Sequence, residues 1–344
     1  MRLLFIIPVV ILFSCKSHTK EKPRLVERSF YYWKSVFQLN REEKELLTGL
    51  KIQHLYIKYF DVDWDAVRSQ AIPIAQITAP ASTFFITKQL EIVPTIFITN
   101  ETIFKINIEQ IEPLANKIVE LVNQINSNFG ITSLKEWQID CDWTSTTKDK
   151  YFTLLKLLQQ KKSSVIFSVT IRLHQIKYLN KTGVPPVKKG MLMCYNMGNL
   201  SNINTGNSIL DVGELRKYIG GLKSYPLNLD VALPLFEWKI LFRKNTFKGI
   251  LENLPDSLLT KNLFTKKGNR YTAIADIILQ GYEIKKNDVL REEISSYEDV
   301  IKAAALINEK LQGDSINVSI FHLDNLTLRK RKLHELENIY DAMR

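Results

Sequence analysis

The chain has 344 residues, of which 45% are hydrophobic and 24% are charged. This composition excludes a mainly disordered chain and a small disulfide-stabilised scaffold, because it provides apolar residues for a large core. The only long uncharged apolar run lies in residues 1–14, which excludes a polytopic membrane protein. The formal net charge is +11, but the lysines are scattered along the chain, so we expect no nucleic-acid partner.

The first fifteen residues predict an export signal. Arg2 supplies a positive charge, and the apolar segment Leu3–Phe13 is too short to span a membrane comfortably. The segment Leu12–Cys15 resembles the signal of a bacterial lipoprotein, in which the cysteine is acylated and becomes the mature N-terminus. Residues 1–15 are therefore expected to be a lipoprotein signal peptide. A plain signal peptide or an uncleaved anchor is the alternative.

The lipoprotein resemblance implies that Cys15 carries acyl chains such as palmitate and is the lipidation site. Acyl chains would hold the protein on a membrane without a spanning helix. Residues 16–28 are then expected to be a polar tether. The expected location is the bacterial cell envelope, and the periplasmic face is favoured over the cell surface because no acidic cluster follows Cys15.

From residue 29 onward, short β-rich segments alternate with segments of helical periodicity. The clearest helix is Glu109–Asn126, whose apolar residues recur every three or four positions. Asp211 and Ser296 are expected to cap the N-termini of two further helices. The predicted strands are Phe30–Trp33, Gln53–Phe60, Ile92–Ile98, Trp137–Asp142, Val165–Ile171, Met191–Tyr195, Leu229–Leu235 and Val318–His322. The other predicted helices are Arg41–Lys51, Lys148–Lys162, Asp211–Lys223, Ser296–Gln312 and Arg329–Met343.

The alternation predicts an α/β protein with parallel strands joined by helical crossovers. Eight strands close into a (β/α)8 TIM barrel, which would occupy residues 29–344. A doubly wound open sheet is the alternative, although no Gly-rich phosphate loop follows any strand. Two segments interrupt the alternation: Ala71–Thr87 and Phe236–Ile294. The second predicts a small β or α+β insertion after strand 7, at about residues 236–294.

Two aspartates on the fourth strand are the first candidate for catalysis. Asp140 and Asp142 point to the same side because side chains alternate along a strand. In a TIM barrel the active site lies at the C-terminal ends of the strands, where a ligand can reach such groups. Their proximity is expected to leave one carboxyl protonated and one ionised, which is an acid/base arrangement.

The fourth strand resembles the Asp-x-x-Asp-x-Asp-x-Glu signature of family 18 glycoside hydrolases, the chitinase-like barrels. Asp140 and Asp142 match the second and third Asp, and Trp143 matches a Trp often found before the Glu. Trp137 replaces the first Asp, and Thr144 occupies the place of the acid Glu. A Thr hydroxyl is not a useful proton donor near pH 7, so the sequence leaves open whether the protein is an enzyme.

Two other strands resemble the same family. Met193–Asn196 is similar to its Met-x-Tyr-Asp, in which the Tyr holds a substrate acetamido group, so the resemblance makes Tyr195 and Asn196 substrate-binding candidates. Leu233–Phe236 is similar to a Leu-Pro-x-Tyr segment that precedes that family's insertion. The start Phe30–Trp33 and the Gln138–Asp142 strand also resemble an uncharacterised branch of barrel lipoproteins, which supports the fold and not an activity.

Aromatic and charged residues at the other strand ends complete the candidate glycan site. The substrate-binding candidates are Trp33, Asp61, Trp143, Arg172, Tyr195, Asn196, Glu237 and Trp238. Sugars pack their C–H faces on aromatic rings, while acids and amides bind the hydroxyls. Arg172 is expected to pair with Asp142. Glu101 or Glu237 could replace the missing acid, although a surface role for Glu101 is the more ordinary interpretation.

Metal and cofactor sites are not expected. The five histidines are dispersed, and no HExxH motif or cysteine pair is present. Cys141 and Cys194 are expected to be free and buried, because strands four and six are not neighbours and both side chains point outward.

Three hypotheses for function follow from these residues. The first is an active glycoside hydrolase that uses Asp140 and Asp142, or Asp142 with Glu101 or Glu237. The second is a non-catalytic glycan-binding lipoprotein on a degenerate hydrolase barrel, which the loss of the acid at Thr144 favours. The third is an envelope scaffold with no sugar ligand, because a fold does not fix a function.

Overall fold

The computed structural model describes residues 23–78, 90–252, 254–324 and 328–344. The predicted signal peptide with Cys15, and the tether up to residue 22, lie outside the described residues. Within the described ranges, none of the helices has the length and apolar character that crossing a bilayer requires.

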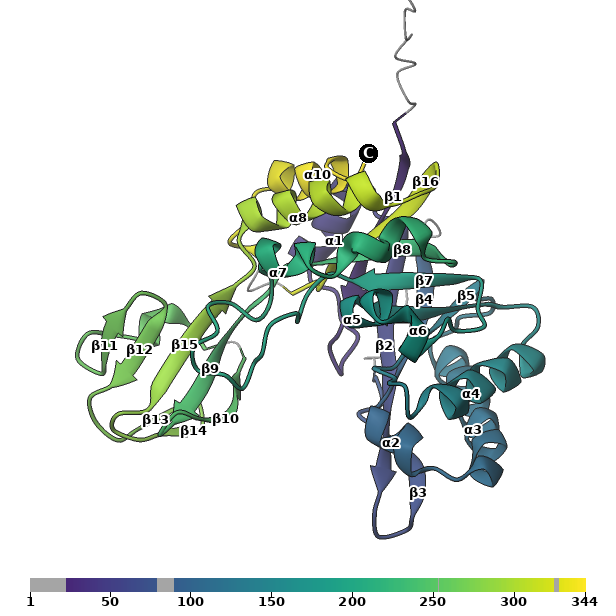
Figure 1. Cartoon of the computed structure of the whole chain (residues 1–344), viewed down its shortest axis with the longest axis horizontal. Coiled ribbons are helices and arrows are strands. Elements are labelled where there is room, and N and C mark those ends of the chain that lie inside the picture. The colour runs from purple at the N-terminus through teal and green to yellow at the C-terminus, as the bar shows by residue number, and fades with distance from the viewer. Residues whose placement is uncertain (1–22, 79–89, 253, 325–327) are drawn as a thin grey trace, which may run out of the picture.

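The centre of the molecule is a closed barrel of parallel strands (Figure 1). The sheet order is β1-β16-β8-β7-β6-β5-β4-β2, and the pairing of β1 with β2 closes the ring. This confirms the predicted (β/α)8 TIM barrel and all of its eight strands. The strands are β1 (Leu25–Tyr32), β2 (His54–Asp65), β4 (Glu91–Ile98), β5 (Glu136–Asp140), β6 (Ile166–Arg172), β7 (Lys189–Met193), β8 (Asn228–Pro234) and β16 (Ser315–Phe321).

The first strand begins earlier than the expected tether boundary at residue 28. Leu25 to Arg28 already pair with Ser315 to Val318 of β16. The charged residues Glu27 and Arg28 conceal this part of the strand in the sequence, because they interrupt the apolar pattern. The barrel therefore includes four residues that were expected to belong to the tether.

Helices cover the outside of the barrel. The long helix α3 (Ile108–Asn128) buries the predicted apolar face, and Ser296 caps α8 (Tyr297–Lys310) by accepting from the backbone N–H of Asp299. The helix expected over Asp211–Lys223 is instead two short pieces, α7 (Val212–Arg216) and a 3-10 segment (Ile219–Ser224). Gly220 and Gly221 lie within the 3-10 segment and disfavour a continuous α-helix there, because each glycine costs about 1 kcal/mol relative to alanine in a helix interior. The other helices are α1 (Arg41–Gly49), α2 (Asn100–Lys105), α4 (Lys148–Lys161), α5 (Leu173–Lys177), α6 (Leu179–Thr182), α8 (Tyr297–Lys310) and α10 (Leu333–Asp341).

The chain between β8 and α8 forms a second, antiparallel sheet that extends to the left in Figure 1. This confirms the predicted insertion after strand 7 and shows that it is a β structure. Its five-stranded sheet has the order β10-β9-β15-β12-β11, and the remaining two strands pair as β13-β14. The strands are β9 (Glu237–Arg243), β10 (Thr246–Leu251), β11 (Phe264–Lys267), β12 (Arg270–Ala273), β13 (Ile277–Leu279), β14 (Tyr282–Ile284) and β15 (Val289–Ile294).

One further strand was not predicted. β3 (Gln70–Ile74) lies in the segment that interrupts the second repeat and pairs antiparallel with the end of β2. The two strands project beyond the barrel (Figure 1). The rest of that segment, from residue 79 to residue 89, lies outside the described residues.

Side chains fill the inside of the barrel. The hydroxyl of Tyr31 donates to Gln138 Oε1 at 2.6 Å, and Lys189 forms ion pairs with Glu136 at 2.7 Å and Asp230 at 3.1 Å. The Lys189 cluster lies at the end where the strands begin, which we call the base. A filled interior leaves the opposite end, where the strands end, as the place for a ligand. We call that end the mouth.

Both described cysteines are free and buried, as predicted. Burial raises the pKa of Cys141 and of Cys194, so both remain thiols at neutral pH.

Candidate functional site

Two neighbouring strands bring an arginine against both candidate aspartates. Asp140 ends β5 and Arg172 ends β6, and these strands are paired. Arg172 Nη2 lies 3.3 Å from Asp140 Oδ1, and Arg172 Nε donates to Asp142 Oδ1. Thr170 Oγ1 also donates to Asp140, at 2.6 Å. A single guanidinium therefore forms ion pairs with both carboxylates.

The two aspartates differ in exposure. Asp140 is 4% exposed, whereas the side chain of Asp142 is 51% exposed and faces solvent at the mouth. Burial raises the pKa of Asp140; Arg172 opposes this shift, and the charge of Asp142 adds to it. Asp140 therefore takes up a proton at a higher pH than an exposed aspartate does.

A pocket of about 250 Å³ opens beside this ion-pair cluster. Four of the sequence-predicted residues line it together: Asp142, Arg172, Tyr195 and Asn196. Its volume is slightly below the usual range for drug-sized ligands, about 300–1,000 Å³. The other lining residues are Leu173, His174, Met197 and Tyr218.

Both hydrogen-bond donors and hydrogen-bond acceptors line this pocket. Burial lowers the pKa of His174, so its imidazole is neutral at pH 7 and can both donate and accept. Asn196 is exposed and has a φ of 54°, in the left-handed region that asparagine tolerates better than most residues. The pocket thus offers a carboxylate, an imidazole and an amide to the hydroxyls of a ligand.

Aromatic rings form a continuous cluster across the mouth. We call Trp33, Tyr195, Phe236, Trp238 and Phe321 the mouth aromatic cluster. The ring centroids of Phe321 lie 5.6 Å from Trp33, 5.0 Å from Tyr195 and 5.7 Å from Phe236. Trp238 extends the cluster because its ring lies 5.1 Å from Phe236. Trp33, Trp238 and Phe321 are partly exposed, so they can present ring surface to a ligand.

Phe321 was missed by the sequence analysis, which assigned the end of the eighth strand to His322. The signal was present, because alternation places Asn317, Ser319 and Phe321 on one side of β16. Asn317 donates to Tyr56 inside the barrel, so Phe321 must face the interior at the mouth.

Trp143 does not belong to the site, contrary to its expected role in substrate binding. Its side chain is 0% exposed. The ring stacks on Tyr151 of α4 at 5.2 Å, and the indole N–H donates to the carbonyl of Thr182 at 3.0 Å. Trp143 lies two residues after Cys141. Side chains alternate along an extended chain, so both point to the same side, away from the barrel interior.

Two other expected substrate ligands, Asp61 and Glu237, do not line the pocket. Asp61 Oδ2 pairs with Lys58 at 3.0 Å. Glu237, at the start of β9, pairs with Lys330 at 2.6 Å. Each carboxylate forms an ion pair with a lysine that lies beside it in the fold. This makes Glu237 a poor replacement for the missing acid.

Glu101, the other candidate replacement acid, lies on the first turn of helix α2. Its side chain is exposed and pairs with Lys105 one turn later, at 2.6 Å. It is absent from the pocket lining. This is the ordinary surface role, and it leaves Glu101 a poor replacement for the missing acid.

Thr144 takes part in the start of helix α4. Its hydroxyl lies 2.9 Å from the hydroxyl of Thr146, and its backbone N–H donates to the hydroxyl of Thr147, the N-cap residue, at 2.9 Å. The side chain at the position of the acid Glu is therefore held by neighbouring threonines. Among the residues that the structure describes, no group of three or more His, Cys, Asp or Glu side chains could hold a metal ion.

Comparison with protein-family models finds no match, and comparison with the sequences of curated proteins finds none. Solved structures do resemble this chain. The spore cortex-lytic enzyme SleL of Bacillus cereus matches with a TM-score of 0.54 at 12% identity, over 94% of this chain and 75% of that protein. A chitinase from Chromobacterium violaceum matches with a TM-score of 0.51 at 9% identity, over 93% of this chain and 98% of the chitinase.

A class V chitinase from Nicotiana tobaccum has the same degree of similarity, with a TM-score of 0.51 at 10% identity over 92% of this chain and 98% of that enzyme. A variant of the same chitinase was solved in complex with NAG4, with the same coverage. At these identities the similarity establishes the fold and not the activity. The chain therefore has the fold of the chitinase-like TIM barrels.

Proposed function

We propose that this protein binds a glycan at the mouth of the barrel and does not hydrolyse it. The mouth aromatic cluster offers ring faces to sugar C–H groups, and the adjacent pocket offers Asp142, His174 and Asn196 to sugar hydroxyls. Similarity to chitinase structures, one of them in complex with NAG4, supports a glycan as the ligand class.

The observation that carries the absence of hydrolysis is the shared arginine. Glycoside hydrolysis needs a carboxylic acid to protonate the leaving oxygen, and in most families a second carboxylate acts as base or nucleophile. Here Arg172 binds both Asp140 and Asp142, and Thr144 stands where the resemblance places the acid. Asp140 is only 4% exposed, and the exposed Asp142 is already bound by Arg172, so neither carboxyl is placed to protonate the leaving oxygen of a substrate.

We expect Trp33→Ala and Trp238→Ala each to weaken glycan binding about tenfold, which is about 1.4 kcal/mol of binding free energy. The reason is that each removes a partly exposed ring from the mouth aromatic cluster. Affinity electrophoresis in gels that contain chitin-type polysaccharide measures the change. Tyr282→Ala is the control, because Tyr282 lies in β14 of the insertion, away from the mouth (Figure 1).

Two results would contradict this proposal. Release of reducing sugar by the wild type, abolished by Asp142→Asn, would show an active hydrolase. The second test uses labelled protein that lacks residues 1–15. If a glycan array retains none of it, an envelope scaffold would be favoured.

We also propose that Cys15 is acylated and anchors the protein in the bacterial envelope, with the periplasmic face favoured. The support is the Leu12–Cys15 segment after a short apolar run. In a bacterial host, the wild type should incorporate labelled palmitate and sediment with membranes, and Cys15→Ser should do neither. The anchor would be disproved if the wild type incorporated no palmitate and was recovered in the soluble fraction.

A further inference from the structure

The loop that follows β7 forms one wall of the pocket. Its first residues, Asn196 and Met197, line the cavity. The backbone N–H of Asn196 donates to the carbonyl of Ile209 at 2.8 Å, and that of Gly198 donates to Ser208 at 3.2 Å. These bonds close residues 196–209 into a hairpin-like loop, which we call the pocket loop. A side chain at position 198 would not fit, because its Cβ would lie 2.8 Å from the Cα of Ser208.

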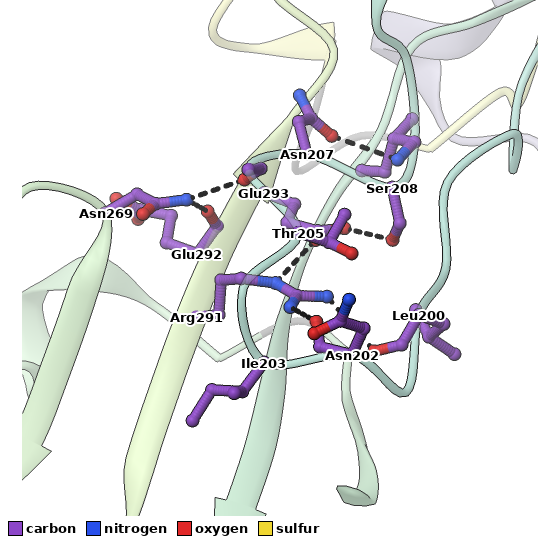
Figure 2. Close-up of polar contacts among 12 residues, drawn as sticks. Leu200, Asn202, Ile203, Thr205, Asn207, Ser208, Asn269, Arg291, Glu292 and Glu293 are labelled. Carbon is purple, nitrogen blue, oxygen red and sulfur yellow. Dashed lines mark hydrogen bonds and ion pairs between the residues drawn. The ribbon is translucent and has the colours of Figure 1, made fainter. Parts of the chain in front are cut away.

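Side chains of the insertion donate hydrogen bonds to the far end of the pocket loop (Figure 2). Arg291 donates to two backbone carbonyls of the loop at 2.5 and 3.1 Å. Arg270 donates to two more at 2.7 and 3.4 Å, and Asn269 donates to one at 2.9 Å. The accepting carbonyls belong to Leu200, Asn202, Ile203, Thr205 and Gly206. The loop conformation is thus recognised through its backbone by side chains of β12, β15 and the turn before β12.

A buried ion pair lies at the centre of this contact. Arg291 and Glu293 are two residues apart on β15, so they share one face of the sheet. Arg291 Nε lies 2.7 Å from Glu293 Oε1, and both side chains are 0% exposed. A charge pair taken fully out of water keeps one arrangement, because any other would leave a buried charge without a partner.

Glu293 connects this ion pair to the mouth aromatic cluster. Its Oε2 accepts from the hydroxyl of Ser208, in the pocket loop, at 2.5 Å. The same oxygen accepts from the indole N–H of Trp238 at 2.8 Å. One carboxylate therefore fixes the pocket loop and the orientation of the outermost ring of the cluster.

We propose that Arg291 and Glu293 are positioning residues of the site: without touching the ligand, they hold the pocket wall at Asn196 and the Trp238 ring in the arrangement that binds a glycan. The glycan part of this inference rests on the proposed function. Neither residue lines the pocket. Their effect on binding must therefore pass through the loop and the tryptophan.

Arg291→Lys tests the proposal. A lysine keeps the positive charge opposite Glu293, but its single ammonium cannot replace the planar fork that contacts Glu293 and two carbonyls together. We expect amide hydrogen exchange at Asn196 and Gly198 to become at least tenfold faster. Glycan affinity, measured at a temperature where the variant is fully folded, should fall about tenfold.

Arg243→Lys is the matched control. Arg243 lies on β9 of the same sheet and pairs with Asp288 at 2.9 Å, and its side chain makes no hydrogen bond to the pocket loop. Its replacement should leave both exchange at Asn196 and glycan affinity unchanged. Quenching of tryptophan fluorescence by a chitin-type glycan adds a second readout, and in Arg291→Lys it should require about tenfold more glycan than in the wild type.

The outcomes separate this inference from the proposed function. Unchanged exchange in Arg291→Lys overturns the positioning role whatever the glycan result. Faster exchange with unchanged affinity also overturns it, because the pair would then hold the loop without serving the site. A wild type that binds no glycan overturns the proposed function and the positioning of a glycan site, while the exchange data still decide whether Arg291 holds the loop.

Discussion

Arg172→Gln should destabilise the fold by about 3–5 kcal/mol at pH 7, because it leaves the buried Asp140 carboxylate without its counter-charge. The effect should depend on pH. Asp140 already has a raised pKa in the folded protein, so the folded state binds its proton more tightly than the unfolded state, where the pKa is about 3.9. Its contribution to stability therefore declines as the pH rises above about 4.

Without Arg172 this decline should be steeper, because the guanidinium is the group that opposes the raised pKa. The difference in unfolding free energy between wild type and Arg172→Gln should shrink as the pH is lowered from 7 to 4. Urea unfolding at several pH values measures it. Arg41→Gln, at an exposed arginine paired with Glu45, is the control and should change stability by less than about 0.5 kcal/mol. An equal loss at pH 7 and pH 4 would show that Asp140 is not the cause.

Trp143→Ala should also cost about 3–5 kcal/mol, for a different reason. The fully buried ring fills the space between β5 and helix α4, and its removal leaves a cavity beside Tyr151. Thermal or urea unfolding measures the loss. Trp33→Ala, at a partly exposed tryptophan of the mouth, should cost only about 1 kcal/mol.

Trp143→Phe distinguishes packing from ligand contact. It keeps most of the ring but loses the indole N–H that donates to the carbonyl of Thr182. We expect about 1–2 kcal/mol of destabilisation and no change in glycan affinity, because the ring has no exposed surface. A large loss of affinity in the folded Trp143→Phe protein would return Trp143 to the binding site.

The barrel could be predicted because its strands and helices repeat with a clear period. The second halves of β7 (Lys189–Met193) and β8 (Asn228–Pro234) are short buried apolar runs, which is typical of strands buried on both faces. β3 could not be predicted, since Pro73 and its exposed neighbours lack such a pattern and it exists only by pairing with β2. Helix α5 is too short for periodicity to identify.

The candidate site was predictable where one rule applied, namely that parallel strands converge at their C-terminal ends. Asp142, Arg172, Tyr195 and Asn196 follow three adjacent strands and line one pocket. Trp143 was assigned wrongly because its resemblance to a family motif was given more weight than the alternation that had been applied to Cys141. The hydrogen bonds from Arg291 to the pocket loop could not be predicted. They join residues about ninety positions apart, and they are accepted by backbone carbonyls, which every residue type carries.

The course of β1 has a consequence for how the protein would be presented at a surface. β1 begins at Leu25 at the base of the barrel and runs toward the mouth, as do the seven strands parallel to it. An attachment through the preceding residues, such as the lipid proposed at Cys15, would therefore direct the aromatic opening outward. The barrel height, roughly 20 Å for strands of this length and tilt, would separate that opening from the bilayer. Polymers in the surrounding space, rather than the headgroups beneath, would be the molecules within its reach.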